Sequence, residues 1–269
     1  MRFFATYKSL RTQKQKNEFY RRNKKRIIQR KKCCYSRPGD DLSQFPLWRA
    51  QHKDNEECDQ CPTCILLPAL SKLYKICSHP ALLQAERDPE TVHGIIEKEA
   101  AQKDIDFARI AIPKHVRKEL PGGLVQESSI LSDHAKLSGK MNAVEYCLKK
   151  YERRGDRVLL FSYSTKTLDL IQQFVKERGY SHLRLDGQTP TGKRQALIDK
   201  FQLNNDIFLF LISTRAGGLG LNLTAANKVL IFDVNWNPSH DEQAQDRAFR
   251  IGQERDVEVV RLVAAGTIE

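Results

Sequence analysis

Val158-Leu-Leu-Phe-Ser162 is a short apolar run between polar and turn-forming residues, a pattern that predicts a buried strand. The segment 165–178 follows with apolar residues at helical spacing, and Gly179 supplies a helix stop signal. A second short apolar run at 183–186 predicts the next strand. Apolar strands that alternate with amphipathic helices are typical of a parallel sheet with helices on both faces.

The same alternation continues toward the end of the chain. It predicts helices at 190–201 and 241–252 and strands at 207–213, 229–233 and 257–264. Ligands of parallel α/β folds bind at the carboxyl ends of the strands, so we expect the functional residues in the loops that follow them. Three loops meet this condition: the loop from 186 onward, 213–222 and 233–238.

Residues 1–40 are expected to form a flexible basic arm. Of the chain's Lys and Arg residues, 13 lie in 1–32 with one acid, Glu18, whereas the rest of the chain carries 32 of each sign. The net charge of +12 therefore resides in this arm, which suits an anionic partner such as nucleic acid. The alternative is a solvated charged tail without a partner.

Residues 41–135 contain most of the cysteines, a helix predicted at 65–83, and a polar stretch at 86–135 that predicts a linker or a surface insertion. The chain has seven cysteines, an odd number that favours a reducing compartment over a secreted disulfide scaffold. No apolar run is long enough to span a bilayer, so no membrane partner is expected.

The spacing Cys58-x-x-Cys61-x-x-Cys64 places three thiols close together and predicts a structural zinc site. Zinc takes four ligands, and the fourth is Cys33, Cys34 or His52. Two alternatives remain, an iron–sulfur cluster and reduced thiols packed as small apolar side chains.

Three further segments carry signals for phosphate binding. Gly187–Arg194 nearly matches a P-loop, but Arg194 replaces the hydroxyl residue that holds magnesium and Pro190 removes a backbone donor, so an ordinary turn and helix is expected. Ser213–Leu223 combines hydroxyls, an arginine and three glycines after a predicted strand, which suits contacts between backbone N–H groups and phosphate.

Gln243–Gln253 is the third and most specific segment. Arg247 and Arg250 are three residues apart, so on the predicted helix they share one face. Two guanidinium groups aimed at one point suit a polyphosphate and the charge that develops during phosphoryl transfer. The alternative is a solvent-exposed helix with salt bridges.

Taken in order, these segments resemble the second RecA-like lobe of Swi/Snf-type DNA translocases, which belong to the superfamily 2 helicases. The resemblance covers 66–83 and 136–269, and the cysteine-bearing stretch is most similar to the Cockayne-syndrome-B-like, DNA-repair branch and its plant Switch-type members. The segments that carry it are Ser-Gly-Lys140, 158–162, 184–187, 213–223, 229–238 and 243–253, with 73–80 similar to the helical segment before that lobe.

The resemblance implies roles for the nucleotide-binding residues. Arg247 and Arg250 match catalytic arginine fingers that reach ATP held mainly by the first lobe. Gln243 matches a residue that senses nucleotide, and Gly220 a position near the ribose. Phe249 stands where the family usually has His.

The resemblance also implies contacts with double-stranded DNA. Ser213, Thr214 and Arg215 match residues that contact its backbone, and Trp236 matches an aromatic residue that engages the tracked strand. Hydroxyl groups, amides and arginine hold phosphates without reading sequence. His240 departs from the usual Asn of the family.

The expected fold is α/β, with a RecA-like parallel sheet covered on both faces at 136–269, preceded by a helical, cysteine-containing protrusion at 41–135 and the basic arm at 1–40. The resemblance implies a nuclear protein whose parent is an ATP hydrolase using magnesium, with chromatin or repair proteins as partners. The first lobe, with its P-loop and acidic magnesium motif, is missing, and the second lobe is expected to be truncated at its C-terminus, so this chain alone is not expected to hydrolyse ATP. The alternative function is a non-catalytic DNA- or partner-binding module that uses the basic arm and the zinc-stapled protrusion.

Overall fold

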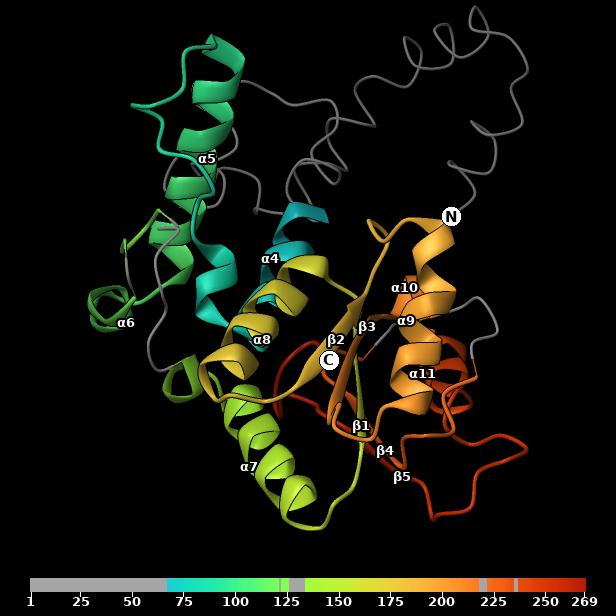
Figure 1. The fold of residues 1–269 in the computed structure, drawn as a ribbon. Coiled ribbons are helices and arrows are strands. Elements are labelled where there is room, and N and C mark those ends of the chain that lie inside the picture. Colours follow the sequence, from blue (N-terminus) through green and yellow to red (C-terminus); the bar gives the residue numbers. More distant parts are fainter. Residues whose placement is uncertain (1–66, 121, 126–133, 218–221, 235–236) are drawn as a thin grey trace, which may run out of the picture. The chain divides into compact units, whose positions relative to one another are not determined.

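A computed structural model describes residues 67–120, 122–125, 134–217, 222–234 and 237–269. Its centre is a five-stranded sheet with the order β2-β3-β1-β4-β5, in which every neighbouring pair is parallel (Figure 1). The strands are β1 (Val158–Ser162), β2 (His182–Leu185), β3 (Leu209–Ser213), β4 (Lys228–Ile231) and β5 (Glu258–Arg261). The predicted parallel sheet is therefore confirmed, and each predicted strand is present.

The helices connect the strands and precede the sheet. They are α4 (Leu67–Ser78), α5 (Ile95–Ala111), α6 (Lys114–Glu119), α7 (Gly139–Arg153), α8 (Thr165–Glu177), α9 (Thr191–Leu203), α10 (Thr214–Gly217) and α11 (Pro238–Gln245), with 3-10 turns η3 (Pro80–Leu83) and η4 (His134–Leu137). The hydroxyl groups of Ser138 and Ser164 cap α7 and α8 by accepting backbone N–H groups of the first turn. Gly179 has φ +75°, which confirms its role as the stop after α8.

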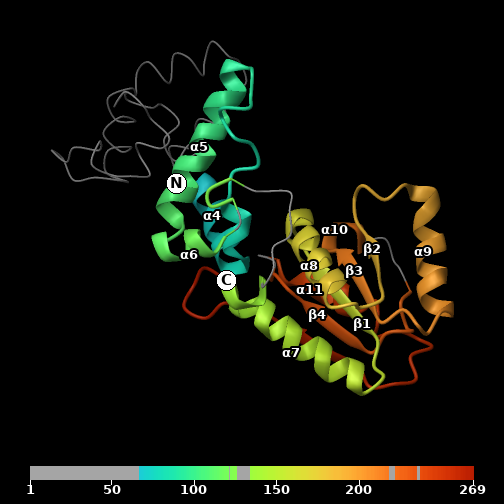
Figure 2. The same cartoon turned by 60° about the vertical axis from the view of Figure 1, so that its left-hand side comes forward.

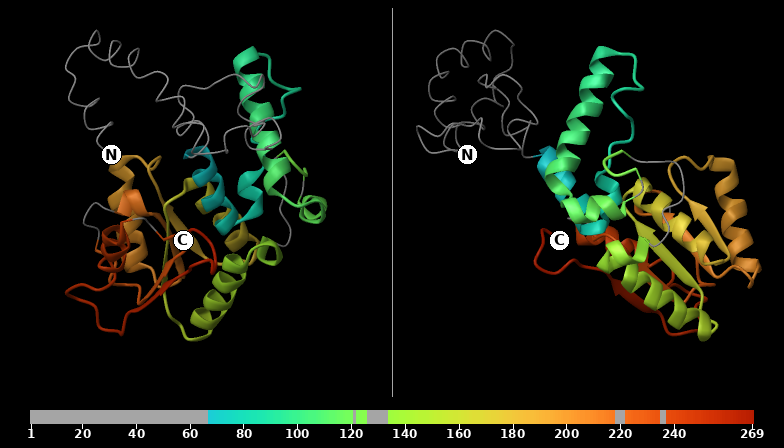
Figure 3. Two further views of the ribbon diagram at one scale, coloured as in Figure 1. Left: turned by 180° about the vertical axis from the view of Figure 1, so that it is seen from behind. Right: turned by 90° about the vertical axis from the view of Figure 1, so that its left-hand side faces the viewer.

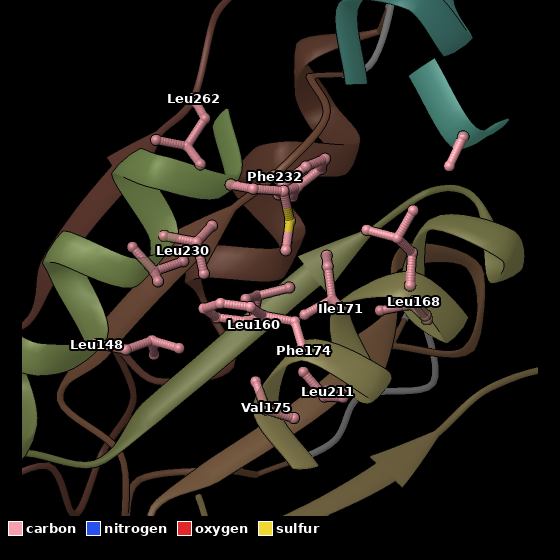
Figure 4. Packing of buried hydrophobic residues seen from close by; sticks show 14 of the residues in the cluster. Leu148, Leu160, Leu168, Ile171, Phe174, Val175, Leu211, Leu230, Phe232 and Leu262 are labelled. Carbon is pink, nitrogen blue, oxygen red and sulfur yellow. The ribbon is translucent and has the colours of Figure 1, made fainter. Parts of the chain in front are cut away.

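Side chains that alternate along each strand point to opposite faces of the sheet and divide the core into two clusters. Leu160 of β1 faces α7 and α8, where it packs with Leu148, Ile171 and Phe174 (Figure 4). The neighbouring Phe161 belongs to the opposite cluster, which α9, α10 and α11 cover. Figure 2 shows the sheet between these two layers of helices. Burial on both faces explains why the strands are apolar throughout.

The region 86–135, for which the sequence predicts a linker or a surface insertion, contains helices α5 and α6, whose positions the sequence did not indicate. Helix α5 buries only a narrow set of residues, among them Ile105 and Phe107, which explains its weak sequence signal. Lys72 of α4 lies over the Phe107 ring and pairs with Asp104 at 2.7 Å, so α4 and α5 lie side by side (Figure 3).

Residues 72–269 form one compact unit in the structure. The predicted basic arm and residues 41–66 of the predicted protrusion lie outside the described residues. Of the cysteines in the protrusion, only Cys77, near the end of α4, is described. No helix of the described ranges is long and apolar enough to cross a membrane.

Candidate functional site

The carboxyl ends of the five parallel strands meet at one edge of the sheet, as the sequence predicts. The loops after β2 and β3 are neighbours along this edge, and those after β1 and β4 follow. The three loops selected from the sequence, which begin at Asp186, Ser213 and Asp233, therefore leave the sheet on the same side. This arrangement makes the edge the candidate functional site.

Three of the residues predicted to contact the DNA backbone lie at the end of β3. Ser213 is the last residue of the strand and is buried, and Thr214 is half-buried at the start of α10. The backbone of Arg215 lies in α10, but its side chain is outside the described part of the structure. Gly220 and Trp236 also lie outside the described residues, so the roles predicted for them stay predictions.

The loop after β2 is held by Asp186 rather than shaped as a phosphate cradle. Its carboxylate accepts the backbone N–H of Gln188 at 2.9 Å and the Arg184 guanidinium at 2.8 Å. Burial on its own would raise the pKa of this carboxyl, but these hydrogen bonds and the Arg184 charge together hold the pKa below its usual value. Helix α9 then begins at Thr191, so the segment forms the turn and helix that the sequence predicts.

The segment after β4 differs from the predicted helix at 241–252. Helix α11 begins at Pro238, capped by the side chain of Asn237, and it ends at Gln245. The next residues form turns with bonds of the i to i−3 type, such as Arg247 N–H to the Ala244 carbonyl at 3.3 Å. The Arg247 carbonyl meanwhile accepts the Leu223 N–H at 3.0 Å, which binds this segment to a neighbouring turn instead of to further helix.

Arg247 and Arg250 therefore do not share a helix face, and the expectation that they do is wrong. Arg247 is 8% exposed, whereas Arg250 is exposed to solvent. Burial, and secondarily the charge of Arg250, lowers the pKa of the Arg247 guanidinium, while Asp246 opposes this change. Arginine stays charged under these conditions because its pKa starts very high.

The Nε atom of Arg247 is buried and has no hydrogen-bond partner among the residues that the structure describes. A buried donor without an acceptor is costly, and in a charged group more so. An oxyanion placed against this edge of the guanidinium would satisfy the donor and offset the buried charge. Arg247 is thus the residue of the site with the clearest chemical requirement for an anion.

The predicted phosphate-binding segments pack against each other. Ala216 of α10 lies in the same core cluster as Ala244 of α11 and Ala248 of the following turn. The small side chains allow close approach between the start of 213–217 and the segment that carries Gln243 and Arg247. Gln243 itself is exposed on α11.

Gln253 supports the site, and its role was not predicted from the sequence. Its side-chain amide donates hydrogen bonds to the carbonyls of Thr224 at 3.0 Å, Ala226 at 2.8 Å and Ala248 at 3.1 Å. These contacts bind the segment around Arg247 to the turn at 223–227. Its position at the end of the motif is its only sequence signal, because the bonds to Thr224 and Ala226 join segments far apart in the chain.

The predicted zinc ligands Cys58, Cys61 and Cys64, and the candidates Cys33, Cys34 and His52, lie outside the described residues. Within the described ranges, no group of three or more His, Cys, Asp or Glu side chains is arranged to hold a metal ion. Cys77 and Cys147 are free and half-buried. Zinc binding therefore stays a prediction.

Comparison with known proteins agrees with this architecture. Residues 139–252 match the family described as "Helicase conserved C-terminal domain". Switch 2 of Arabidopsis thaliana is 44% identical over 245 residues, which are 90% of this chain and 27% of that protein. DNA excision repair protein ERCC-6-like 2 of Mus musculus is 39% identical over 240 residues, 89% of this chain and 14% of that protein.

Two further matches support the same assignment. A Caenorhabditis elegans homolog of the "SWI/SNF-related matrix-associated actin-dependent regulator of chromatin subfamily A containing DEAD/H box 1" is 51% identical over 132 residues, 49% of this chain and 13% of that protein. The crystal structure of the C-terminal part of the Fun30 ATPase domain has a TM-score of 0.60 and 28% identity, covering 90% of this chain and 81% of that chain.

The fold and the matched segment define a helicase C-terminal domain built on a RecA-like sheet. Residues 139–252 are therefore a helicase C-terminal domain, and the chain is similar over most of its length to Switch 2 and to the ERCC-6 excision repair proteins. It spans only 27% of the length of Switch 2 and smaller shares of the other curated relatives given above.

Proposed function

We propose that this chain is the second motor lobe of an ATP-dependent translocase of double-stranded DNA, acting in chromatin remodelling or DNA repair. The observation that supports this most directly is the buried guanidinium of Arg247, whose Nε atom lacks an acceptor among the described residues. A γ-phosphate presented by a first lobe would supply that acceptor and would place the positive charge where negative charge develops.

In this proposal the two kinds of contact are made at one edge of the sheet. Arg247 and Arg250 act as arginine fingers, with Gln243 and Gly220 beside the nucleotide. Ser213, Thr214, Arg215 and Trp236 contact the DNA backbone and the tracked strand. The shared core of α10 and α11 would transmit closure of the lobes on ATP to the DNA-binding loops.

The remaining parts of the proposal follow from the family. ATP binds with magnesium that the first lobe mainly holds, and the chain acts in the nucleus with double-stranded DNA, the first lobe, and chromatin or repair proteins as its partners. The cysteine cluster at 58–64 would bind zinc as a structural staple, outside the catalytic chemistry.

The test replaces Arg247 by Ala in a protein that contains both lobes. DNA-stimulated ATP turnover is expected to fall by about 10²–10³-fold, because the variant lacks a charge that acts in the transition state. Affinity for duplex DNA is expected to stay unchanged. The matched control is Arg153→Ala, which removes an exposed arginine from the last turn of α7. Retained turnover in the Arg247 variant would refute the assignment.

A non-catalytic DNA-binding module is the second candidate, and the charge of the N-terminal arm favours it. Residues 1–32 carry the net charge of +12, which suits binding to the DNA backbone without chemistry. Deleting this arm would then abolish DNA affinity and its salt dependence, whereas substitutions at Ser213 and Arg247 would change neither. If the chain is a motor lobe, Ser213→Ala is instead expected to lower the affinity for duplex DNA.

A further inference from the structure

Lys140 and Glu269 form an ion pair inside the described part of the lobe. The ammonium of Lys140 lies 2.6 Å from Oε1 and 2.5 Å from Oε2 of Glu269, and the two side chains are 5% and 0% exposed. The second carboxylate oxygen also accepts the backbone N–H of Ala264 at 3.0 Å. The start of α7 is thereby joined to the segment that follows β5.

The same ammonium also reaches the end of β4. Lys140 Nζ donates to the Phe232 carbonyl at 3.0 Å and lies 5.6 Å from the centroid of the Phe232 ring. Phe232 is the residue directly before Asp233, where the chain leaves the sheet toward Trp236 and α11. A single lysine thus fixes the backbone at the point from which two proposed functional segments begin.

Asp233 is held from the opposite side. Its carboxylate accepts the hydroxyl of Ser162, the last residue of β1, at 2.7 Å and the N–H of Tyr163, the next residue, at 2.6 Å. Burial raises the pKa of this carboxyl, and the hydrogen bonds from Tyr163 and Ser162 and the charge of Lys140 counter it in part. The end of β4 is therefore held by α7 and 264–269 on one side and by Ser162 and Tyr163 at the end of β1 on the other.

Such an arrangement is a poor device for stability alone. A buried ion pair loses so much solvation that apolar residues of similar size often stabilise a protein as well or better. In some proteins buried charged and hydrogen-bonded groups instead select one relative position of the elements they join. The partners of Lys140 follow two neighbouring strands, Phe232 directly after β4 and Glu269 in the segment after β5, so these contacts set one position of the β4 end.

We propose that Lys140 and Glu269 are positioning residues that fix the carboxyl end of β4, from which the chain continues to Trp236 and α11, the residues proposed to meet DNA and nucleotide. This inference rests on the proposed motor function for its consequence in DNA binding, but its structural content is independent of that function. The residues touch neither ligand and act through Phe232 and Asp233.

Lys228 supplies the matched control for Lys140→Met, because it is a buried lysine at the opposite end of β4. Lys228 begins β4, is 8% exposed, and pairs with Glu258 at 3.3 Å and Asp156 at 3.8 Å. Lys140→Met therefore removes a buried lysine that contacts the carboxyl end of β4, whereas Lys228→Met removes a buried lysine that belongs to the amino end of β4. Glu269→Gln removes the charge of the partner but keeps the size of its side chain. It therefore serves as the test if Lys140→Met fails to fold.

Two measurements on the full chain separate positioning from stability. Hydrogen exchange of the backbone amides at 237–245 is expected to accelerate in Lys140→Met and Glu269→Gln but not in Lys228→Met. Affinity for a short labelled duplex DNA is expected to fall on the order of tenfold in Lys140→Met, and by no further factor when Trp236→Ala is already present.

The outcomes are distinguishable. Equal exchange at 237–245 in the two lysine variants, relative to the native chain, would overturn the positioning role. Additive losses of affinity from Lys140→Met and Trp236→Ala would overturn it as well, since the lysine would then act elsewhere. If Trp236→Ala leaves affinity unchanged, the proposed DNA contact fails, and the exchange measurement alone decides for or against the positioning role.

Discussion

The guanidinium carbon of Arg157 lies 4.1 Å from the centroid of the Phe201 ring, which places a charged side chain directly on the core of α9. Arg157 is 6% exposed, and its N–H groups donate to the carbonyls of Ile207 and Asn204, each at 3.0 Å, and to that of Phe201. The residue that enters β1 thus caps the end of α9 and the turn that leads into β3.

Arg157→Lys is expected to lower the free energy of unfolding by about 2–4 kcal/mol, because an ammonium cannot satisfy several carbonyls in this planar arrangement or stack on the ring. Urea unfolding followed by circular dichroism measures the loss. Arg153→Lys is the control, since Arg153 is exposed, and it should change stability by less than about 0.5 kcal/mol. Equal effects of the two substitutions would contradict the capping role.

Replacing Arg247 should have opposite effects on stability and on turnover. Arg247→Met removes a buried charge whose Nε atom lacks an acceptor among the described residues, so the free energy of unfolding is expected to rise by about 1–2 kcal/mol. In a protein with both lobes the same variant should lose ATP turnover. Arg250→Met, at an exposed position, should alter stability by less than about 0.5 kcal/mol. A destabilised Arg247→Met chain would mean that the guanidinium serves the fold.

The lowered pKa of Asp186 predicts that the free energy of unfolding decreases in acid. Its pKa is below the usual value in the folded state, so the unfolded chain takes up a proton first as the pH falls through about 4. The stabilisation from this carboxylate is therefore complete above that pH and is lost as the pH falls further, through the folded pKa. Asp186→Asn should be less stable than the native chain at about pH 6, and the difference should shrink toward about pH 2. A difference that is constant with pH would contradict the contribution of charge.

The sequence predicted the sheet because its strands are buried on both faces and carry an uninterrupted apolar signal. Leu160 pairs with Leu211 on one side and Leu230 on the other, so each of these three segments is apolar for the same reason. Helix α5 was missed because it buries few side chains and is polar elsewhere. A helix that is polar over most of its surface has a composition similar to that of a linker, so composition alone does not distinguish the two.

The site could be predicted only where its signal is local. The loops at the strand ends follow from the strand pattern. The end of α11 does not, because the Arg247 carbonyl accepts a hydrogen bond from the Leu223 N–H, which belongs to a distant part of the sequence. The pairing of Lys140 with Glu269 joins residues 129 positions apart, which no periodicity reports. At the site, tertiary hydrogen bonds of this kind decided the end of α11 and the position of the β4 end, which the sequence did not predict.

Gln253→Glu tests how strongly the Arg247 segment depends on its tertiary bonds. The substitution preserves shape but replaces the amide donor by a carboxylate, which would face the carbonyls of Thr224, Ala226 and Ala248. Loss of these bonds is expected to lower the free energy of unfolding by about 2–4 kcal/mol at neutral pH, with recovery in acid as the carboxyl gains a proton. Gln195→Glu, on the exposed face of α9, should shift stability by less than about 0.5 kcal/mol. In a protein with both lobes Gln253→Glu should also reduce ATP turnover more than duplex DNA affinity, because the residue binds the segment that carries Arg247. Stability and turnover that match those of the Gln195 variant would show that the Arg247 segment keeps its position without the Gln253 amide.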